Sequence, residues 1–196
     1  MRILLIGATG TIGEEVATAL GERHEVIRAS RRHADEQVDL SEPESIRALF
    51  ERVGRVDAVV SAAGQAAFKP LAELGDDDFA LSLGDKLMGQ VNLVRYGLDC
   101  VDDGGSFTLT AGTLGRHPEP RSAAVSLVNA GLEGFTRAAA LEAPRGIRVN
   151  VVSPPWVTET LEALGRPPEG GLPAETVAKA YVRSVEGQDT GKVLTP

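Results

Sequence analysis

The sequence predicts an α/β fold, a doubly wound parallel sheet with helices on both faces. Short apolar runs that stop at glycine or proline alternate with segments whose apolar residues recur at helical spacing. The segments between successive runs are long enough for the crossovers that parallel strands require. With 196 residues and no internal repeat, the chain suits one domain, and we expect residues 1–196 to form it.

Three strands and two helices are expected in the first part of the chain. The first apolar run stops at a glycine cluster, as a buried parallel strand does before a turn. The next segment carries one apolar stripe that Gly21 closes, and Ser41 with Glu44 makes a capping-box pattern ahead of a second helical face. The expected elements are strands over 1–6, 25–29 and 56–61, a helix over 11–21 and a helix that follows Ser41.

The second part of the chain is expected to alternate in the same way. Asp76, Asp77 and Asp78 stand where the positive end of a helix dipole favours acidic side chains, at the start of a long helix. Pro154 and Pro155 must end the strand before them. The stretch 165–173 is rich in Gly and Pro and is interpreted as a mobile connection. The expected elements are helices over 78–101, 123–142 and 174–184 and strands over 106–110, 147–152 and 192–195.

Charge and composition exclude several classes of function. Lys and Arg number 20 against 28 Asp and Glu, a net charge of −8 with no basic tract, which argues against a nucleic-acid partner because phosphate binding needs clustered cations. No apolar run approaches the ~18 residues of a membrane-spanning helix, and no signal peptide is visible, so we expect no membrane contact and a cytoplasmic location. The single cysteine excludes an internal disulfide, and no metal-ligand spacing is present.

A glycine-rich turn between the first strand and the first helix predicts a dinucleotide site. Its glycines let the chain turn tightly, bring a pyrophosphate close to the main chain and pack the helix on the strand. The helix N-terminus offers free N–H groups to the anion. The spacing is GxxGxxG rather than the common GxGxxG, and a turn without a ligand is the alternative interpretation. The candidate contacts are Gly7, Thr9, Gly10, Thr11, Ile12 and Gly13.

The end of the second strand favours one nucleotide over the other. An NAD site usually has an acid there for the ribose hydroxyls, whereas the 2′-phosphate of NADP requires cations. This strand ends in Ser30, Arg31 and Arg32. We therefore expect NADP(H) rather than NAD(H), the alternative being two solvated surface arginines.

Three further stretches, taken with the glycine-rich turn, resemble the short-chain dehydrogenase/reductase family, which has a Rossmann fold. Asp39-Leu40 looks like the family's adenine-contacting Asp-Val, and Ser61-Ala62-Ala63-Gly64 is similar to its Asn-Asn-Ala-Gly stretch. The segment from Arg148 to Thr158 resembles RVNxxxPGxxxT, with Pro155 in place of the glycine. The resemblance covers essentially the whole chain. It implies further cofactor contacts at Asp39, Leu40, Ala62, Ala63, Gly64, Pro154, Trp156, Val157 and Thr158.

The resemblance breaks at the family's catalytic pair. Family members use a Tyr as acid and base, and a Lys four residues later lowers the pKa of that Tyr and holds the ribose. The stretch from Asn129 to Phe135 looks like the continuation that follows this Lys, which puts Val125 at the Tyr position and Asn129 at the Lys position. No tyrosine in the chain is followed by a lysine four residues later. Valine has no proton to donate, but Asn129 still offers a hydrogen bond to a ribose hydroxyl.

Three groups are candidates to replace the missing chemistry. Lys86 falls where the family's Asn faces the catalytic centre, and its ammonium would polarise a carbonyl or serve as the acid; the alternative is a lysine on a solvated face. Thr110 and Thr113 flank the family's Ser position, and either hydroxyl would bond a substrate oxygen unless it bonds only backbone. His117 lies in the following loop, where a surface histidine is the alternative.

Residues 159–173 are expected to form a short segment that covers the substrate pocket. This segment is shorter than the insertion that family members usually carry, so we expect an open pocket with Val157, Leu161 and Leu164 as its cover. Trp156 either walls this pocket or packs under the cover.

These observations support three hypotheses about function. The first is an NADP(H)-dependent oxidoreductase that moves hydride to or from a small carbonyl or alcohol, with Thr110, Thr113 or Lys86 polarising the oxygen. The second is an NADP(H)-binding or sensing protein without turnover, and the third is a lyase or isomerase on the same fold. The resemblance also implies a homo-oligomer that associates through the two long helices.

Overall fold

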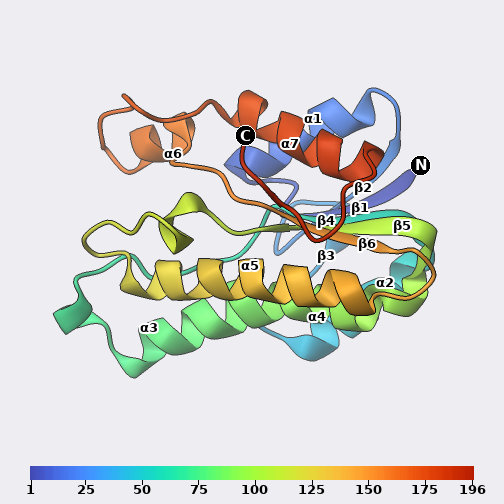
Figure 1. Cartoon of the computed structure of the whole chain (residues 1–196), viewed down its shortest axis with the longest axis horizontal. Helices are drawn as coiled ribbons and strands as arrows, with labels where there is room; N and C mark the ends of the chain where they lie inside the picture. The colour runs from blue at the N-terminus through green and yellow to red at the C-terminus, as the bar shows by residue number, and fades with distance from the viewer.

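The computed structural model describes all 196 residues and confirms the predicted fold class. Seven strands form one parallel sheet in the order β3-β2-β1-β4-β5-β6-β7, and helices lie on both of its faces (Figure 1). The strands are β1 (Arg2–Ile6), β2 (Glu25–Ser30), β3 (Glu36–Gln37), β4 (Val56–Ser61), β5 (Val101–Thr110), β6 (Arg148–Val152) and β7 (Val193–Leu194).

The helices divide into two layers. In Figure 1, α1, α6 and α7 lie above the sheet, and α2, α3, α4 and α5 lie below it. The helices are α1 (Thr11–Gly21), α2 (Pro43–Val53), α3 (Asp76–Leu81), α4 (Gly89–Gly97), α5 (Ala123–Glu142), α6 (Thr158–Ala163) and α7 (Ala174–Glu186). A π-helical segment, η2 (Ser82–Met88), joins α3 to α4, and the short 3₁₀ turns are η1 (Leu71–Glu73), η3 (Leu98–Cys100) and η4 (Thr113–Gly115).

Each face of the sheet has its own apolar core, because successive side chains of a strand point to opposite faces. Ile3 and Leu5 of β1 pack in the core that α1 and α7 share. Leu4 and Ile6 of the same strand pack in the core beneath α2, α4 and α5. Burial on both faces explains why the strands read as continuous apolar runs instead of alternating patterns.

The sheet reverses its order of connection beside β1. This strand pairs with β2 on one side and with β4 on the other, so the chain leaves the carboxyl ends of β1 and β4 in opposite directions. In open α/β sheets a crevice forms at such a point, and ligands bind there. The glycine-rich turn follows β1, and the stretch 62–64 follows β4.

One helix start differs from the prediction. The second helix, α2, begins at Pro43 after Glu42, and no side chain caps it. The Ser41 hydroxyl instead donates to Asp39 Oδ1 at 2.6 Å. The capping-box prediction is wrong because this nearby carboxylate takes the hydroxyl, and because a proline in the first turn has no N–H to satisfy.

The helix expected over 78–101 is a composite of several helical types. It begins at Asp76, passes through α3, η2 and α4, and ends in a 3₁₀ turn, so that Val101 already belongs to β5. The two-residue β3 and the six-residue α6 were not expected, since elements this short carry no readable period. No helix has the length and apolar character that spanning a bilayer requires.

Candidate functional site

The glycine-rich turn forms a cradle between β1 and α1. Gly7 has a φ of +83°, and its N–H donates to the Ala29 carbonyl oxygen at 2.8 Å. A Cβ at Gly13 would stand 1.9 Å from the Gly7 carbonyl oxygen, so this approach of helix to strand requires glycine. Gly10 precedes α1 and no side chain caps the helix. The first N–H groups of α1, beginning at Thr11, are therefore available to an anion.

A recess of about 240 Å³ extends from this cradle toward the end of β2. It brings together predicted contacts from four separate segments, because the carboxyl ends of β1, β2 and β4 meet at one edge of the sheet. The predicted contacts that line it are Gly7, Thr9, Gly10, Ser30, Arg31, Leu40, Ala62, Ala63 and Gly64.

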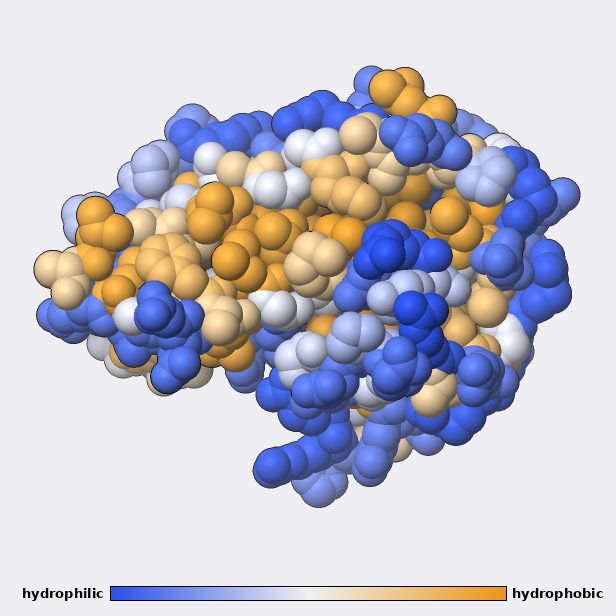
Figure 2. All heavy atoms as spheres, turned by 90° about the horizontal axis from the view of Figure 1, so that it is seen from below, coloured by the Kyte–Doolittle hydropathy of each residue, from blue (hydrophilic) through white to orange (hydrophobic).

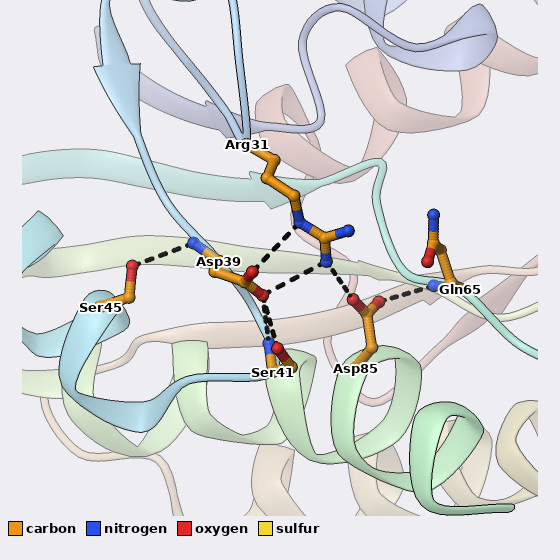
Figure 3. A network of polar contacts seen from close by, with 6 residues as sticks. All are labelled: Arg31, Asp39, Ser41, Ser45, Gln65 and Asp85. Atoms are coloured by element: carbon orange, nitrogen blue, oxygen red, sulfur yellow. Dashed lines mark hydrogen bonds and ion pairs between the residues drawn. The ribbon is translucent and has the colours of Figure 1, made fainter. Parts of the chain in front are cut away.

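Arg31 lies across this recess and joins two carboxylates (Figure 3). Its Nη2 is 2.7 Å from Asp85 Oδ2, and its Nε is 3.2 Å from Asp39 Oδ2. Asp85 is buried and also accepts the N–H of Gln65 at 2.6 Å. The neighbouring Arg32 is exposed and makes no ion pair. Asp85 is not among the site residues predicted from the sequence. The one feature of the sequence that could have indicated it is its position next to Lys86.

The Asp39 carboxylate is held ionised by its neighbours. The Ser41 hydroxyl and N–H donate to it, and the positive charge of Arg31 adds to their effect, so the pKa of Asp39 is lowered from 3.8 although partial burial opposes this shift. An anionic Asp39 suits contact with a hydrogen-bond donor such as an adenine amino group.

A larger cavity of about 640 Å³ opens beside the cradle, where β4, β5 and β6 end. It contains most of the predicted catalytic and nicotinamide-side residues. The predicted residues that line it are Ile12, Ala62, Ala63, Gly64, Lys86, Thr110, Thr113, Asn129, Pro154, Trp156, Val157 and Leu164.

Three predicted residues do not line this cavity. His117 is exposed in the loop after η4, and Thr158 directs its hydroxyl toward Gly171, where a Cβ would stand 2.9 Å from it. Leu161, expected in the cover, points inward from α6 and is 4% exposed. Thr160 takes its place beside Leu164, because a short helix presents only one of its sides to the cavity.

Lys86 projects from the π-helical segment into the larger cavity. The side chain is half-buried, and its Nζ donates to the Ala111 carbonyl oxygen at a long 3.4 Å. Burial lowers the pKa of Lys86 from 10.5 to about 8, although the Asp85 carboxylate favours the charged form. Gly64 packs so closely on this residue that a Cβ there would stand 3.0 Å from Lys86 Cα. An ammonium that loses its proton near neutral pH is suited to proton transfer.

The two threonines differ in what their hydroxyls bond. The Thr110 hydroxyl donates to the Ser61 carbonyl oxygen and pairs with the Tyr181 hydroxyl, so it faces the core under α7. Burial raises the pKa of Tyr181 well above its usual range. Thr113 lies at the start of η4, half-buried, and is fixed by its N–H to the Pro154 carbonyl oxygen at 2.9 Å. Its hydroxyl makes no hydrogen bond within the chain, and the residue lines the cavity, so this hydroxyl is available to a ligand.

Asn129 lines the same cavity and has an unsatisfied acceptor. Its side chain is 2% exposed, and Oδ1 has no hydrogen-bond partner. An unpaired buried acceptor is costly unless a ligand completes it, and a ribose hydroxyl is a suitable donor. Val125 lies one turn earlier on α5 and also lines the cavity. The uncapped α1 cradle and this unpaired amide both fit a dinucleotide.

Aromatic and basic side chains form the outer rim of the cavity. Trp156 and Phe68 meet edge to face with ring centroids 5.4 Å apart, and the Trp156 Nε1–H donates to Glu119 at 3.0 Å. Arg166 lies over the Trp156 ring at 4.5 Å. Of the two positions expected for Trp156, in the pocket wall or under the cover, the structure shows the first. Phe68, Arg121 and Arg166 were missed because they come from loops without a motif.

Comparison with known proteins identifies relatives that match two thirds of the chain or more. A family model described as enoyl-(acyl carrier protein) reductase matches residues 9–194. Hydroxynaphthalene reductase arp2 of Aspergillus fumigatus is 34% identical over 139 residues, which are 68% of this chain and 51% of that protein. Short-chain dehydrogenase/reductase ABA4 of Pyricularia oryzae is 27% identical over 204 residues, covering 96% of this chain and 75% of that protein. The chain thus spans between about half and three quarters of these curated relatives.

Solved structures match the chain over its full length. The protein lin1944 of Listeria innocua is 44% identical, with a TM-score of 0.96 over 100% of this chain and 98% of that one. A small-chain dehydrogenase in complex with NADPH is 27% identical, with a TM-score of 0.88 over 100% and 96% of the two chains. These matches agree with the observed fold of the chain.

Proposed function

Because this chain belongs to the short-chain dehydrogenase/reductase family of oxidoreductases, we propose that it is an NADP(H)-dependent oxidoreductase whose catalytic site is rearranged. Its reaction moves a hydride and a proton to a small carbonyl compound, or the reverse from an alcohol. The observation that carries this proposal is Lys86, a half-buried ammonium in the larger cavity with a pKa of about 8.

The two recesses together hold the cofactor in this proposal. The α1 cradle binds the pyrophosphate, the Arg31 recess binds the adenosine half, and Asn129 bonds the ribose on the nicotinamide side. When bound, NADP(H) supplies the hydride chemistry. Arg31 and Arg32 receive the 2′-phosphate, and Arg31 exchanges at least one of its carboxylate partners to do so. The NADPH complex of a similar dehydrogenase supports this assignment.

Lys86 and Thr113 together replace the family's catalytic tyrosine, which this chain lacks. The Lys86 ammonium donates its proton to the carbonyl oxygen as negative charge develops there, and the Thr113 hydroxyl donates a hydrogen bond to the same oxygen. Thr110, although it lines the cavity, is left out of this role because its hydroxyl bonds Ser61 and Tyr181. The segment 159–173, which includes Thr160, Leu164 and Arg166 of the cavity wall, covers the substrate.

A second candidate is an NADP(H)-binding protein without turnover. Val125 favours it, since an apolar side chain lines the cavity at the position that resembles the family's proton donor. The two candidates share the cofactor and differ only in whether Lys86 transfers a proton.

The first experiment separates these candidates. NADPH and NADH are titrated into the protein, with the fluorescence of its only tryptophan, Trp156, and calorimetry as readouts. We expect tighter binding of NADPH and a loss of that preference in Arg31→Ala. Turnover is then assayed on a panel of carbonyl compounds with wild type and Lys86→Met. Binding without any turnover would select the second candidate, and no binding of either nucleotide would overturn both.

The face below the sheet supports association of identical chains. Figure 2 shows apolar residues in a broad band across this face. The large exposed apolar side chains on its helical segments are Leu81, Leu83, Met88, Leu127 and Leu141. A band of this kind is costly in water unless it is covered. We therefore extend the proposal to a homo-oligomer that forms through the composite α3–α4 helix and α5.

A further inference from the structure

We propose that the substrate is an acidic carbonyl compound, one that carries a carboxylate or a phosphate on an apolar body, and that Arg121 and Arg166 bind its acidic group. This inference rests on the proposed function, because it names the substrate class of the same cavity. It is carried by the charge of the cavity wall, the placement of the two arginines and the aromatic ring on which they converge.

The wall of the larger cavity has a charge opposite to that of the whole chain. Acidic residues outnumber basic ones by 28 to 20 in the sequence. The cavity is nevertheless lined by Lys86, Arg121 and Arg166 and by no Asp or Glu. Since the low-dielectric walls of a cleft concentrate the field of such charges, the cavity attracts anions.

The two arginines converge on one aromatic ring. The Cζ atoms of Arg121 and Arg166 lie 5.6 Å and 5.9 Å from the centroid of Phe68. Arg121 comes from the loop before α5 and Arg166 from the loop after α6, so two distant segments bring like charges to the same place. An anion bound beside Phe68 would be attracted by both guanidinium groups.

Neither guanidinium is fully paired within the chain. Arg121 makes no ion pair, and its backbone has a φ of +76°, a strained value for a residue with a side chain. Arg166 is 3.6 Å from Glu119, but its Nη1 is buried and has no hydrogen-bond partner. A buried donor without a partner needs an acceptor, and the planar guanidinium matches both carboxylate and phosphate oxygens.

The remaining wall accommodates the apolar body of such a compound. Phe68 and Trp156 present their rings beside the arginines, and Val125 and Leu114 add apolar surface to the cavity that Lys86 also lines. A substrate that spans this distance places its acidic group at the rim and its carbonyl near the ammonium. Arg121 and Arg166 follow β5 and β6, whereas the cradle for the cofactor pyrophosphate follows β1.

The test compares ligands that differ only in their acidic group. Para- and meta-acetylbenzoate, their methyl esters and para-acetylphenyl phosphate are titrated by calorimetry into protein saturated with NADP⁺, which cannot reduce a ketone. We expect the carboxylates or the phosphate to bind about tenfold more tightly than the neutral esters. The affinity of the phosphate relative to that of the two carboxylates shows which kind of acidic group the site prefers. Arg121→Gln and Arg166→Gln should each remove most of this difference.

Arg137→Gln serves as the matched control. Arg137 is an exposed arginine on α5 about two turns beyond Asn129, and it does not line the cavity. This variant should leave the preference for the acid unchanged. Equal affinity for acids and esters would overturn the inference while NADPH binding and turnover of neutral ketones stand. Acids that bind only without NADP⁺, in competition with it, would also overturn the inference, because the arginines would then serve the cofactor phosphates.

Discussion

Lys86 shows how one residue depends on its immediate surroundings. A lysine on a solvated helix keeps its pKa above 10, but this side chain enters a cavity between Gly64 and Ala111, where burial lowers its pKa to about 8. Asp85, the next residue along the chain, is buried on the other side and pairs with Arg31. Two adjacent residues of one π-helical segment thus face the two recesses.

The pH dependence of turnover tests the role of Lys86. The ammonium is the active form for reduction, so the rate should fall as pH rises through about 8, where Lys86 loses its proton. Lys86→Met should lower kcat by about 10²–10⁴-fold and remove this limb of the profile. Lys86→Arg keeps the charge without a transferable proton, so it should restore little activity. A pH profile with the same limb in Lys86→Met would contradict the proposal.

Stability should respond to the same side chain with a defined sign. The pKa of Lys86 is lower in the folded protein than the 10.5 of the free side chain, so the unfolded chain binds more protons between about pH 8 and 10.5. The free energy of unfolding contributed by this group therefore rises with pH in that window. Lys86→Met should raise Tm most below pH 8, and the gain should shrink by pH 10. A gain independent of pH would exclude the titration of Lys86 as its cause.

Asn129 should affect ligand binding and stability in opposite directions. Asn129→Leu removes the unpaired buried Oδ1 and keeps the volume of the side chain, so Tm should stay level or rise. The affinity for NADPH should fall about tenfold because a ribose hydroxyl loses its acceptor. Calorimetry and thermal unfolding measure the two effects. Unchanged NADPH affinity would remove Asn129 from the proposed cofactor site.

At the scale of elements, the close approach of α1 to β1 positions the proposed cofactor site. The helix lies so near the strand that its first turn has no room for a Cβ at Gly13. The composite helix shows a similar dependence at Gly89, where a Cβ would stand 2.7 Å from the Leu40 side chain. Such contacts hold the carboxyl ends of the strands and the helix N-terminus in one fixed arrangement.

Gly13→Ala should damage both stability and cofactor binding. The added methyl group would meet the Gly7 carbonyl oxygen at 1.9 Å, and α1 would have to shift. Overpacking of this kind costs about 1–3 kcal/mol, measured as the free energy of unfolding in urea. Gly21→Ala is the matched control on the same helix, since a Cβ there meets nothing within 4 Å. If the two variants behave alike, the close approach does not position the site.

For the whole molecule, the exposed apolar band determines whether the chain associates. The band lies on the face opposite α1 and α7, away from the helices that pack over the other side of the sheet (Figures 1 and 2). A homo-oligomer through this face would bury residues of α5, the same helix that carries Val125 and Asn129 into the cavity. Association would therefore stabilise one wall of the candidate site.

Leu127→Glu tests this association. Leu127 is 49% exposed on α5. A carboxylate buried in an apolar interface loses its hydration, so the substitution should raise the free energy of the associated state. The mass measured by analytical ultracentrifugation should fall to that of the monomer. Leu71→Glu is the matched control, because Leu71 is 71% exposed on η1 and should not change the mass. A monomeric wild type, or an unchanged mass in Leu127→Glu, would contradict the proposal.

The sequence by itself determined the fold class and the glycine-rich turn after β1. The strand and helix periods, the glycines at 7, 10 and 13 and the proline stop after β6 are local features, and the sheet and the α1 cradle follow them. Ser41 shows the limit of such reasoning. Its hydroxyl donates to the Asp39 carboxylate and does not provide the cap for α2 that the local pattern predicts.

Only the tertiary structure decided which side chains meet. Thr110 and Thr113 have identical side chains, but the Thr110 hydroxyl is hydrogen-bonded in the core to Tyr181, which is 71 residues away in the sequence. Asp85 meets Arg31 across 54 residues, and the two arginines of the rim converge on Phe68 from separate loops. Periodicity records only neighbours along the chain, whereas these contacts depend on how strands are ordered and where the helices cross them. The chemistry of this site is therefore a property of the folded molecule.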